Sequence, residues 1–267
     1  MRGAGAIEVE GLRKVFHQTG SGEAVVAIER LDFGVRQGDM VAIVGQTGCG
    51  KSTFLNLLIG LDRPSEGRIA IGGRQPYDEF DHFRGVLAAV FQQDRLLPWR
   101  TALDNVRLPL ELLGRDPREQ VERARAWLDR LGLARFEGAY PHELSGGMRQ
   151  RVALARAFAI EPALLLADEA FGHLDEVTAA ALRATFLDLA RTEGNTAILV
   201  THQLEEAIEM GGRILVFGRP GKLLADLDLR AWPAGRVAGL RADIQRMLQS
   251  NEPDPRFPIP TTEDSRA

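Results

Sequence analysis

The stretch that decides the fold is Gly45-Gln46-Thr47-Gly48-Cys49-Gly50-Lys51-Ser52, or GQTGCGKS in one-letter code. An apolar run over residues 40–44 precedes it, and apolar residues at helical spacing follow it over residues 54–58. A strand, a glycine-rich loop and a helix in this order are the context in which the pattern predicts a phosphate loop. We therefore expect an α/β fold whose core carries a phosphate loop.

The residue types of this loop suit the binding of a nucleoside triphosphate. The glycines allow successive backbone N–H groups to point at phosphate oxygens, and the N-terminus of the following helix adds partial positive charge. Lys51 is expected to reach the β- and γ-phosphates, and Ser52 to hold Mg²⁺ through its hydroxyl. Thr53 is expected to serve the helix start or a phosphate contact. The alternative is a glycine-rich turn without a ligand, which the flanking strand and helix disfavour.

A second apolar strand, at residues 164–167, delivers two acids, Asp168 and Glu169, at its carboxyl end. Ligands of an open α/β sheet bind at the carboxyl ends of the strands. Asp168 is suited to coordinate Mg²⁺ through water, and Glu169 is suited to position and polarise an attacking water. The alternative is an acid pair that faces solvent at the end of a strand.

The remaining pattern predicts a discontinuous α/β core with additions. Apolar alternation near residues 7–9 and 25–27 predicts an antiparallel hairpin, with its turn at residues 19–22, followed by another strand at residues 31–35. Helical signals dominate residues 94–160, where Asp116 is a predicted helix cap. Two further apolar strands are expected at residues 198–200 and 214–217, with a helix at residues 177–190 before them. Together with residues 164–167 they predict a parallel sheet with crossover helices.

Composition excludes several classes of protein. The chain has 267 residues, 45% hydrophobic and 26% charged, with a formal net charge of -4, so a globular domain is expected and nucleic acid is an unexpected main ligand. No stretch approaches the roughly 18 consecutive apolar residues that would span a bilayer, and residues 1–10 lack a signal-peptide pattern. The single cysteine excludes an internal disulfide and a cysteine-cluster metal site. We expect the chain to remain in the cytosol.

Cys49, that single cysteine, lies inside the phosphate loop, and its chemistry has two interpretations. Proximity to Lys51 and to a helix N-terminus predicts a lowered thiol pKa and rapid reaction with maleimides, which bound ATP would prevent. The alternative is a small buried side chain with an inert thiol. The sequence leaves both open.

The run Leu144-Ser145-Gly146-Gly147-Met148-Arg149-Gln150 resembles the signature of the ATP-binding cassette (ABC) transporter family. Ser145 precedes a predicted helix whose N–H groups, uncovered at Gly146 and Gly147, can bind an anion. The resemblance implies that two chains pair head to tail around two ATP molecules. Each ATP then contacts the phosphate loop of one chain and the signature of the other, with Gln150 among the nucleotide-binding residues. The alternative is a capped helix start without a ligand.

Further positions resemble the family in the expected order along the chain. Phe16 resembles the aromatic that stacks on adenine, Gln92 the glutamine between the lobes that contacts Mg²⁺ and the catalytic site, and His202 the switch histidine. Asp175, with Leu174, resembles the segment that crosses the dimer interface. Each position alone has a structural alternative, because such residues more often pack or face solvent. The chain departs from the family pattern at three positions, Ala170, His173 and Gln203, which affects the expected turnover and dimer signalling.

The fold, the domain organisation and the partners follow from the same resemblance. It implies a RecA-like P-loop NTPase core with a parallel sheet, an N-terminal antiparallel β subdomain and an inserted α-helical subdomain. We expect an ABC ATPase domain over residues 5–231, with a helical subdomain at about residues 94–160. A C-terminal extension at residues 232–267 is expected to be largely disordered at its end. One cassette, without a coiled-coil arm or a fused spanning segment, implies a separate integral membrane permease, a periplasmic or extracellular solute-binding protein, and a peripheral location on the cytoplasmic face of the inner membrane.

Residues 94–99 resemble those of the importer group for nitrate, sulfonates, taurine and related solutes. The resemblance implies that Leu97, Pro98 and Trp99 contribute to an apolar groove for a helix of the permease. The alternative for Trp99 is packing within the helical lobe. A soluble cassette ATPase that acts on nucleic acid or ribosomes is the second functional hypothesis. The signature argues against a third, a P-loop metabolite kinase.

Overall fold

The computed structural model describes residues 6–17, 23–172, 174–210, 212–232, 237–257 and 259. The chain divides into two compact units, which are described separately. Unit 1 contains residues 1–83 and 196–267, and unit 2 contains residues 84–195. The predicted turn at residues 19–22 and His173 lie outside the described residues, as do residue 258 and residues 260–267 of the predicted disordered tail.

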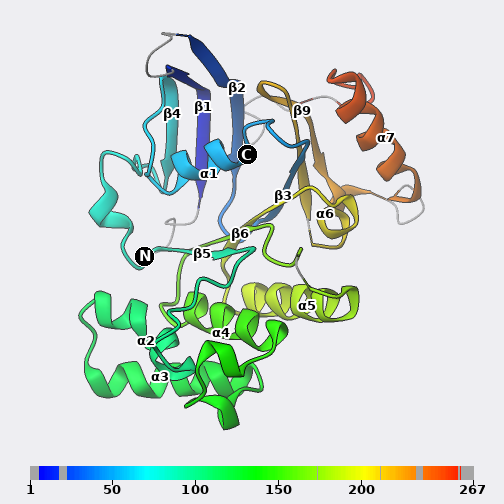
Figure 1. Ribbon diagram of the computed structural model, residues 1–267. Coiled ribbons are helices and arrows are strands. Elements are labelled where there is room, and N and C mark those ends of the chain that lie inside the picture. The colour runs from blue at the N-terminus through cyan, green and yellow to red at the C-terminus, as the bar shows by residue number, and fades with distance from the viewer. Residues whose placement is uncertain are drawn as a thin grey trace. The chain divides into compact units, whose positions relative to one another are not determined.

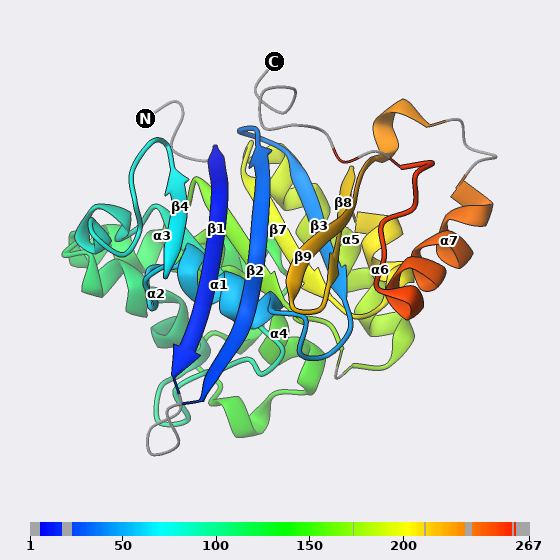
Figure 2. The same ribbon diagram turned by 90° about the horizontal axis from the view of Figure 1, so that it is seen from above.

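Unit 1 is built on a mixed sheet with the strand order β4-β1-β2-β9-β8-β3-β7 (Figures 1 and 2). Strand β3 pairs in parallel with β7 and β8, whereas β1 pairs antiparallel with β2 and β4. A parallel core next to an antiparallel β subdomain is the arrangement predicted from the sequence. Its strands are β1 (Ile7–His17), β2 (Ala24–Val35), β3 (Met40–Gly45), β4 (Glu66–Ile71), β7 (Thr196–Thr201), β8 (Arg213–Gly218) and β9 (Gly221–Asp228).

One predicted boundary in this sheet is wrong. The sequence pattern suggested one strand near residues 25–27 and another at residues 31–35, but β2 is a single strand of 12 residues. Its partner β1 is nearly as long, and the register runs from Ile7 opposite Val35 to His17 opposite Ala24. Register shifts along this ladder accommodate the interruption in apolar alternation, so the strand continues through it.

The helix that follows the phosphate loop packs on the sheet of unit 1. Helix α1 (Lys51–Leu58) packs on the sheet through Phe54, whose ring centroid lies 5.6 Å from that of Phe33 on β2 and 5.8 Å from that of Phe217 on β8. All three rings are fully buried. This aromatic cluster anchors the helix that follows the phosphate loop. The other helices are η1 (Phe80–Phe83), α6 (Leu204–Met210), η4 (Leu229–Ala231) and α7 (Val237–Ser250).

Helix α7 is a feature that the sequence analysis did not predict within the C-terminal extension. It buries Leu240, Ile244 and Met247 in a cluster with residues of α6, β8 and β9, including Ile214 and Leu224. The rings of Trp232, before α7, and Phe257, after it, stack with centroids 5.7 Å apart. The described part of the extension is therefore packed onto unit 1 (Figure 1).

Unit 2 contains a parallel strand pair and the helical segment predicted from the sequence. Strands β5 (Leu87–Phe91) and β6 (Leu164–Asp168) pair in register, with Phe91 opposite Asp168. The predicted cap at Asp116 is confirmed, because its carboxylate accepts a 2.9 Å hydrogen bond from the N–H of Arg118. The helices are α2 (Ala102–Leu112), α3 (Pro117–Arg130), η2 (Ala134–Phe136), η3 (Pro141–Glu143), α4 (Gly146–Phe158) and α5 (Glu176–Thr192).

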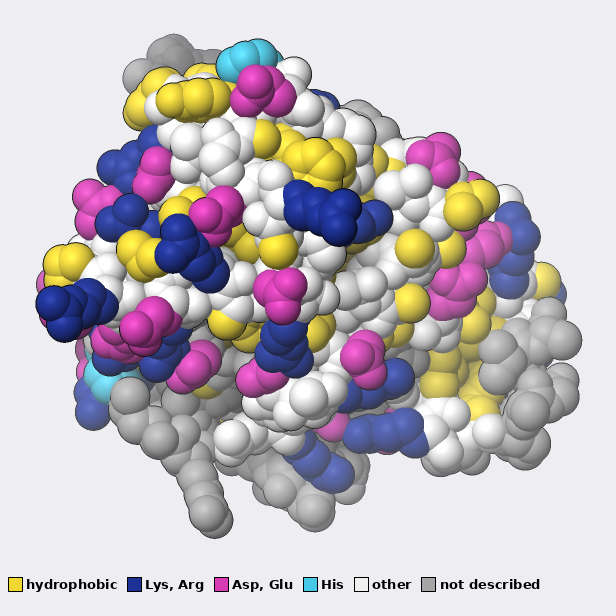
Figure 3. Space-filling view, turned by 90° about the horizontal axis from the view of Figure 1, so that it is seen from below, with side chains coloured by type: hydrophobic (Ala, Val, Ile, Leu, Met, Phe, Trp, Pro, Cys, Tyr) yellow, Lys and Arg dark blue, Asp and Glu magenta, His cyan; other side chains and the backbone are white. Residues whose placement is uncertain are grey.

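The surface carries both signs of charge. In Figure 3, dark blue and magenta side chains alternate over the face in view, in keeping with 33 Lys and Arg and 37 Asp and Glu in the sequence. Within the part of the chain that the structure describes, no helix is both long and apolar enough to cross a membrane.

Candidate ATP-binding site

The phosphate loop joins β3 to α1 in the geometry that anion binding requires. Gly48 and Gly50 adopt left-handed backbone conformations, with φ of 79° and 92°. Gly50 is the N-cap of α1 and offers no side-chain acceptor to the N–H groups of the first helical turn. These N–H groups and the positive end of the helix dipole therefore remain suited to a phosphate group.

Two glycines of the loop are required by close packing as well. A Cβ at Gly45 would lie 2.4 Å from Cys49 Sγ and 2.7 Å from the carbonyl oxygen of Phe217. A Cβ at Gly50 would lie 2.6 Å from the carbonyl oxygen of Ala27. The loop is thus held against β2 and β8 by contacts that only glycine permits.

Lys51 is the cation of this loop, and its ammonium group contacts the loop itself. The side chain is buried, and Nζ donates hydrogen bonds of 2.7 Å to the carbonyl oxygen of Gly45 and 3.3 Å to that of Gln46. Carbonyl oxygens compensate a buried ammonium only partly, so a phosphate would be a stronger partner for it. The cradle and its cation fit a nucleotide.

The environment of Cys49 distinguishes the two interpretations of its thiol, reactive or buried and inert, that the sequence left open. The side chain is only 1% exposed, and burial raises its pKa above the ordinary value, although Lys51 lowers it in part. The prediction of a lowered pKa is therefore wrong. Desolvation disfavours the thiolate more strongly than the nearby ammonium favours it, so the structure supports a buried thiol of low reactivity.

Two further predicted residues lie in unit 1. His202 follows β7, and since Thr201 pairs with Val44 of β3, this exposed histidine extends from the same sheet edge as the phosphate loop. Phe16 on β1 is 39% exposed, and Lys14 Nζ lies 4.7 Å from the centroid of its ring. Its exposed side chain leaves it available for stacking on a base, and this role stays a prediction.

The acid pair of unit 2 lies at the carboxyl end of β6, as predicted. Asp168 ends the strand opposite Phe91, and Gln92 therefore leaves the neighbouring strand at the same edge. A Cβ at Gly172 would lie 3.7 Å from Gln92 Nε2, which places this side chain beside the loop that follows the acids. The carboxylate of Asp168 and the amide oxygen of Gln92 are donor types that Mg²⁺ prefers. Ser52, which is also a predicted Mg²⁺ ligand, lies in the first turn of α1 in unit 1.

Glu169 has a strained backbone for its residue type. Its φ is 48°, in the left-handed region that non-glycine residues rarely adopt, and its carbonyl oxygen accepts the N–H of Gly172 at 3.2 Å. Strain of this kind is concentrated at functional sites. The observation supports a functional role for this carboxylate, which the sequence predicted without any indication of strain.

The signature forms the start of α4, packed closely beside the start of α5. Ser145 is the N-cap of α4 and its Oγ accepts the N–H of Met148 at 3.3 Å. A Cβ at Gly147 would lie 2.8 Å from Thr178 Cγ2 on α5, so this glycine permits the close approach. Asp175 is the N-cap of α5, and its hydrogen bonds from Thr178 lower its pKa. Asp175 therefore has a structural task besides its predicted one.

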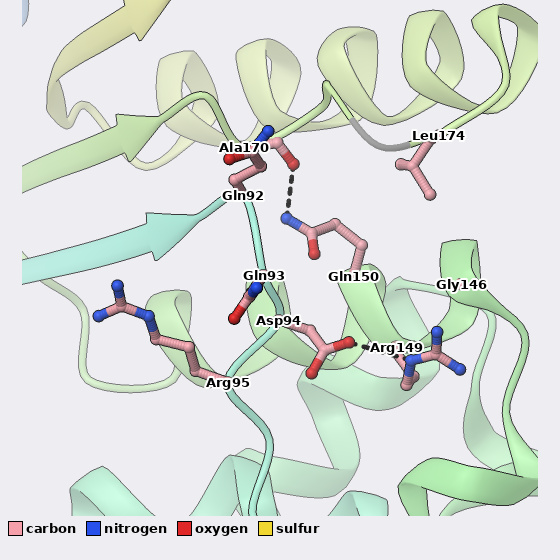
Figure 4. A pocket seen from close by; sticks show the side chains of 9 residues that line it. All are labelled: Gln92, Gln93, Asp94, Arg95, Gly146, Arg149, Gln150, Ala170 and Leu174. Atoms are coloured by element: carbon pink, nitrogen blue, oxygen red, sulfur yellow. Dashed lines mark hydrogen bonds and ion pairs between the residues drawn. The ribbon is translucent and has the colours of Figure 1, made fainter.

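A pocket of about 410 Å³ in unit 2 lies between the signature and the segment after Gln92 (Figure 4). Gln150 directs its amide Nε2 to the carbonyl oxygens of Ala170, at 2.6 Å, and Phe91, at 3.1 Å. Through these contacts Gln150 connects the end of β5 to the loop that follows Asp168 and Glu169. The residues that line the pocket are Gln92, Gln93, Asp94, Arg95, Gly146, Arg149, Gln150, Ala170 and Leu174.

An ion pair in this pocket was not identified from the sequence. Arg149 Nε lies 3.0 Å from Asp94 Oδ2, and Arg149 Nη1 donates to the carbonyl oxygen of Leu144 at 2.7 Å. Arg156 adds hydrogen bonds to the carbonyl oxygens of Asp94 and Arg95. The signature helix is thereby joined to the segment that follows Gln92.

Comparison with known proteins places this geometry in a family. A family model of the ABC transporter matches residues 28–172. The taurine import ATP-binding protein TauB of Rhizobium johnstonii is 39% identical over 257 residues, covering 89% of this chain and 95% of that protein. The aliphatic sulfonates import ATP-binding protein SsuB of Pseudomonas putida is 38% identical over 262 residues, covering 94% of this chain and 91% of that protein.

A solved structure is similar over most of the chain. The dimeric post-hydrolysis state of the ATP-binding cassette MJ0796, bound to ADP and Pi, has 33% sequence identity and a TM-score of 0.74, covering 85% of this chain and 100% of that one. A phosphate loop, a strand-end acid pair and a signature helix therefore occur here on a cassette fold, and this chain belongs to the ABC transporter family. Within that family it is the subunit that binds and hydrolyses ATP.

These comparisons confirm the predicted family, the P-loop NTPase fold and the ATPase class. The roles of individual residues stay predictions, as do the domain limits.

Proposed function

We propose that this ATPase drives the import of small anionic or zwitterionic solutes, of the sulfonate, taurine or nitrate type, through a separate membrane permease. Support comes from relatives named for taurine and aliphatic sulfonate import, each of which aligns with this chain over nearly the whole of its own length. The residues at 94–99 support the same group. A soluble solute-binding protein would deliver the solute to the permease on the far side of the membrane.

The single observation that carries this proposal is an exposed apolar tip in the segment that follows Gln92. Trp99 is 71% exposed, which excludes the alternative that it packs within unit 2. Asn105 of α2 is fully buried and holds the backbone of this segment, accepting the N–H of Leu97 at 2.8 Å and donating to the carbonyl oxygen of Arg100 at 3.0 Å. A rigidly held, exposed tryptophan is a suitable anchor for a permease helix.

We assign the site residues as follows. Lys51 and the N–H groups of the phosphate loop bind the phosphates, and Phe16 stacks on adenine. Glu169 orients and polarises the attacking water, and His202 contacts the reacting phosphate from the neighbouring strand. Mg²⁺, supplied with ATP and held by oxygens of Ser52, Asp168 and Gln92, would neutralise phosphate charge.

We also propose a head-to-tail homodimer in which each ATP contacts the Ser145, Gly146 and Gly147 segment of the second chain. The helix N-terminus at the start of α4 supports this assignment, since backbone N–H groups and the positive end of the helix dipole at such a terminus favour an anion. With a membrane permease as partner, the dimer would lie on the cytoplasmic face of the inner membrane.

The test is reconstitution with a membrane permease of the sulfonate, taurine or nitrate importer group. We expect co-purification of the two, and ATP-dependent uptake of taurine, an alkanesulfonate or nitrate into proteoliposomes. Trp99→Ala should weaken permease binding by about tenfold or more. Its ATPase activity without permease should be unchanged. Phe136→Ala removes another exposed aromatic of unit 2, 42% exposed, and should have no effect on binding.

The alternative function gives a different result. Recovery of ribosomes or nucleic acid with this chain, and never of an integral membrane protein, would refute import. Equal permease binding by Trp99→Ala and the wild type would refute the anchoring role of the tryptophan alone.

A further inference from the structure

The C-terminal extension contacts the phosphate loop through residues that the proposed function does not use. Asn251 lies directly after α7, to which its N–H is bonded at the carbonyl oxygen of Met247, 2.8 Å away. Its side chain forms two hydrogen bonds with the backbone of Arg219. Oδ1 accepts the N–H of Arg219 at 2.7 Å, and Nδ2 donates to its carbonyl oxygen at 2.6 Å.

Arg219 carries this contact to the phosphate loop. Since Gly45 pairs with Phe217 of β8, the residue after β8 emerges at the same sheet edge as the loop. The guanidinium group of Arg219 donates a hydrogen bond from Nη2 to the carbonyl oxygen of Thr47. Its Nε and Nη2 atoms lie 4.0 Å from the position of a Cβ on Gly48. Arg219 thus covers the tip of the loop.

A second contact joins α7 to the neighbouring residue of the loop. Gln46 Nε2 donates a 2.9 Å hydrogen bond to the carbonyl oxygen of Leu248, in the last turn of α7. The extension therefore holds two successive loop residues, Gln46 directly and Thr47 through Arg219. Because α7 is itself buried against β8, β9 and α6, both contacts start from a fixed base.

The orientation of one peptide group explains why these contacts matter. In a trans peptide the carbonyl oxygen of Thr47 and the N–H of Gly48 point in opposite directions. Holding the oxygen at Arg219 therefore turns this N–H away from Arg219. Phosphate binding by such loops depends on backbone N–H groups that are oriented before the ligand arrives.

We propose that Asn251 and Arg219 form a latch through which the C-terminal extension fixes the Thr47–Gly48 peptide of the phosphate loop for ATP binding. Both are positioning residues, and Asn251 acts through Arg219. The proposal rests on the phosphate loop as the nucleotide site of the proposed function. It gives the extension a task in nucleotide affinity and none in the chemical step.

The test uses the full chain with Asn251→Gly, which removes the side chain and tolerates the left-handed backbone at this position, φ 57°. Loss of the latch should raise the Kd and the KM for ATP about five- to thirtyfold, as expected for two lost hydrogen bonds. The kcat should remain within about twofold of the wild type, because no group at the reacting phosphate has changed. Gln245→Ala, at an exposed position of α7, is the matched control and should leave all three values unchanged.

A double-mutant cycle separates the latch from a structural role. Arg219→Ala, at an exposed position, should weaken ATP binding to a similar extent, and adding Asn251→Gly should weaken it no further. A merely structural role would lower the unfolding midpoint of Asn251→Gly without changing the Kd, or would multiply the two effects.

Each outcome decides the proposal. An unchanged Kd in Asn251→Gly, or multiplied effects in the double variant, would overturn the latch. Failure of the wild type to bind ATP would instead overturn the nucleotide site on which the latch rests.

Discussion

Substitution of Gly50 by alanine should separate two requirements of the phosphate loop, backbone conformation and space. Gly50 has φ of 92°, and an alanine Cβ would lie 2.6 Å from the carbonyl oxygen of Ala27 and 3.3 Å from Ile28 Cγ1. Two other glycines provide matched controls. Gly38 has φ of 82° with nothing within 4 Å of the added atom, and Gly48 has φ of 79° with only Arg219 at 4.0 Å.

The magnitudes follow from these distances. A left-handed conformation costs an alanine about 1–2 kcal/mol, which all three variants should lose in free energy of unfolding. Gly50→Ala must also displace a backbone carbonyl, and overpacking of this kind costs a further 1–3 kcal/mol or so. We therefore expect a loss of about 2–5 kcal/mol for Gly50→Ala, against about 1–2 kcal/mol for Gly48→Ala and Gly38→Ala.

The assay is urea unfolding followed by circular dichroism, combined with calorimetric titration of ATP. Gly50→Ala and Gly48→Ala should both lose ATP affinity, because both change the loop that carries the phosphate-binding N–H groups. Gly38→Ala should bind ATP like the wild type, since it lies in the turn between β2 and β3. Stability and binding thus respond to different subsets of the three variants.

Two results would refute this reasoning. Equal losses of stability in Gly50→Ala and Gly38→Ala would show that the contact with Ala27 relaxes freely. Unchanged ATP affinity in Gly50→Ala would show that the loop does not bind the phosphates.

Three further predictions concern the acid, the composite site and the thiol. Glu169→Gln should keep ATP affinity and lower turnover by about 10²-fold or more. Gel filtration of this variant with ATP should show a dimer. A monomer under conditions of confirmed ATP binding would count against the head-to-tail dimer. Lys51→Ala and Ser145→Arg should each abolish phosphate release, yet doubly tagged mixed dimers of the two variants should regain part of it, because one of their two sites is then intact. Absence of recovery would mean either that the site is built within one chain or that turnover needs two working sites. A crosslink between the Ser145 and Gly45 loops of the two chains distinguishes these explanations. Cys49 should react slowly with maleimide at neutral pH, with or without Mg-ATP, and much faster after unfolding in urea, because burial raises the pKa of its thiol. The same raised pKa means that the folded state holds the thiol proton more tightly than the unfolded state does. The thiol therefore contributes stability below its unfolded pKa, and this contribution is lost as pH rises through the folded pKa. Equal maleimide labelling of folded and unfolded chains would refute the burial argument.

The sequence determined the parts of this protein whose chemistry is local. The phosphate loop, the acid pair after residues 164–167 and the signature are each contiguous, and their flanking patterns predict the strands and helices on which the structure places them. Because the loop conformation depends on its own glycines and its adjacent elements, few residues suffice to identify it. Family, fold and reaction followed from these runs.

Helix α7 marks an intermediate case. Its apolar residues Leu240, Ile244 and Met247 follow helical spacing, so a signal for the helix was present in the sequence. The proline- and charge-rich residues around it concealed that signal. Whether such a helix packs on the protein depends on a complementary apolar surface, which β8, β9 and α6 provide only once they are folded.

Only the tertiary structure decided the properties that depend on distant segments. The pKa of Cys49 is raised because the folded chain buries its thiol, while Lys51, only two positions along the chain, suggested the opposite direction. The contact between Arg219 and Thr47 spans 172 positions, and that between Asn251 and Arg219 spans 32. Periodicity and motif spacing describe neighbours along the chain, whereas desolvation and positioning depend on which segments the fold brings together.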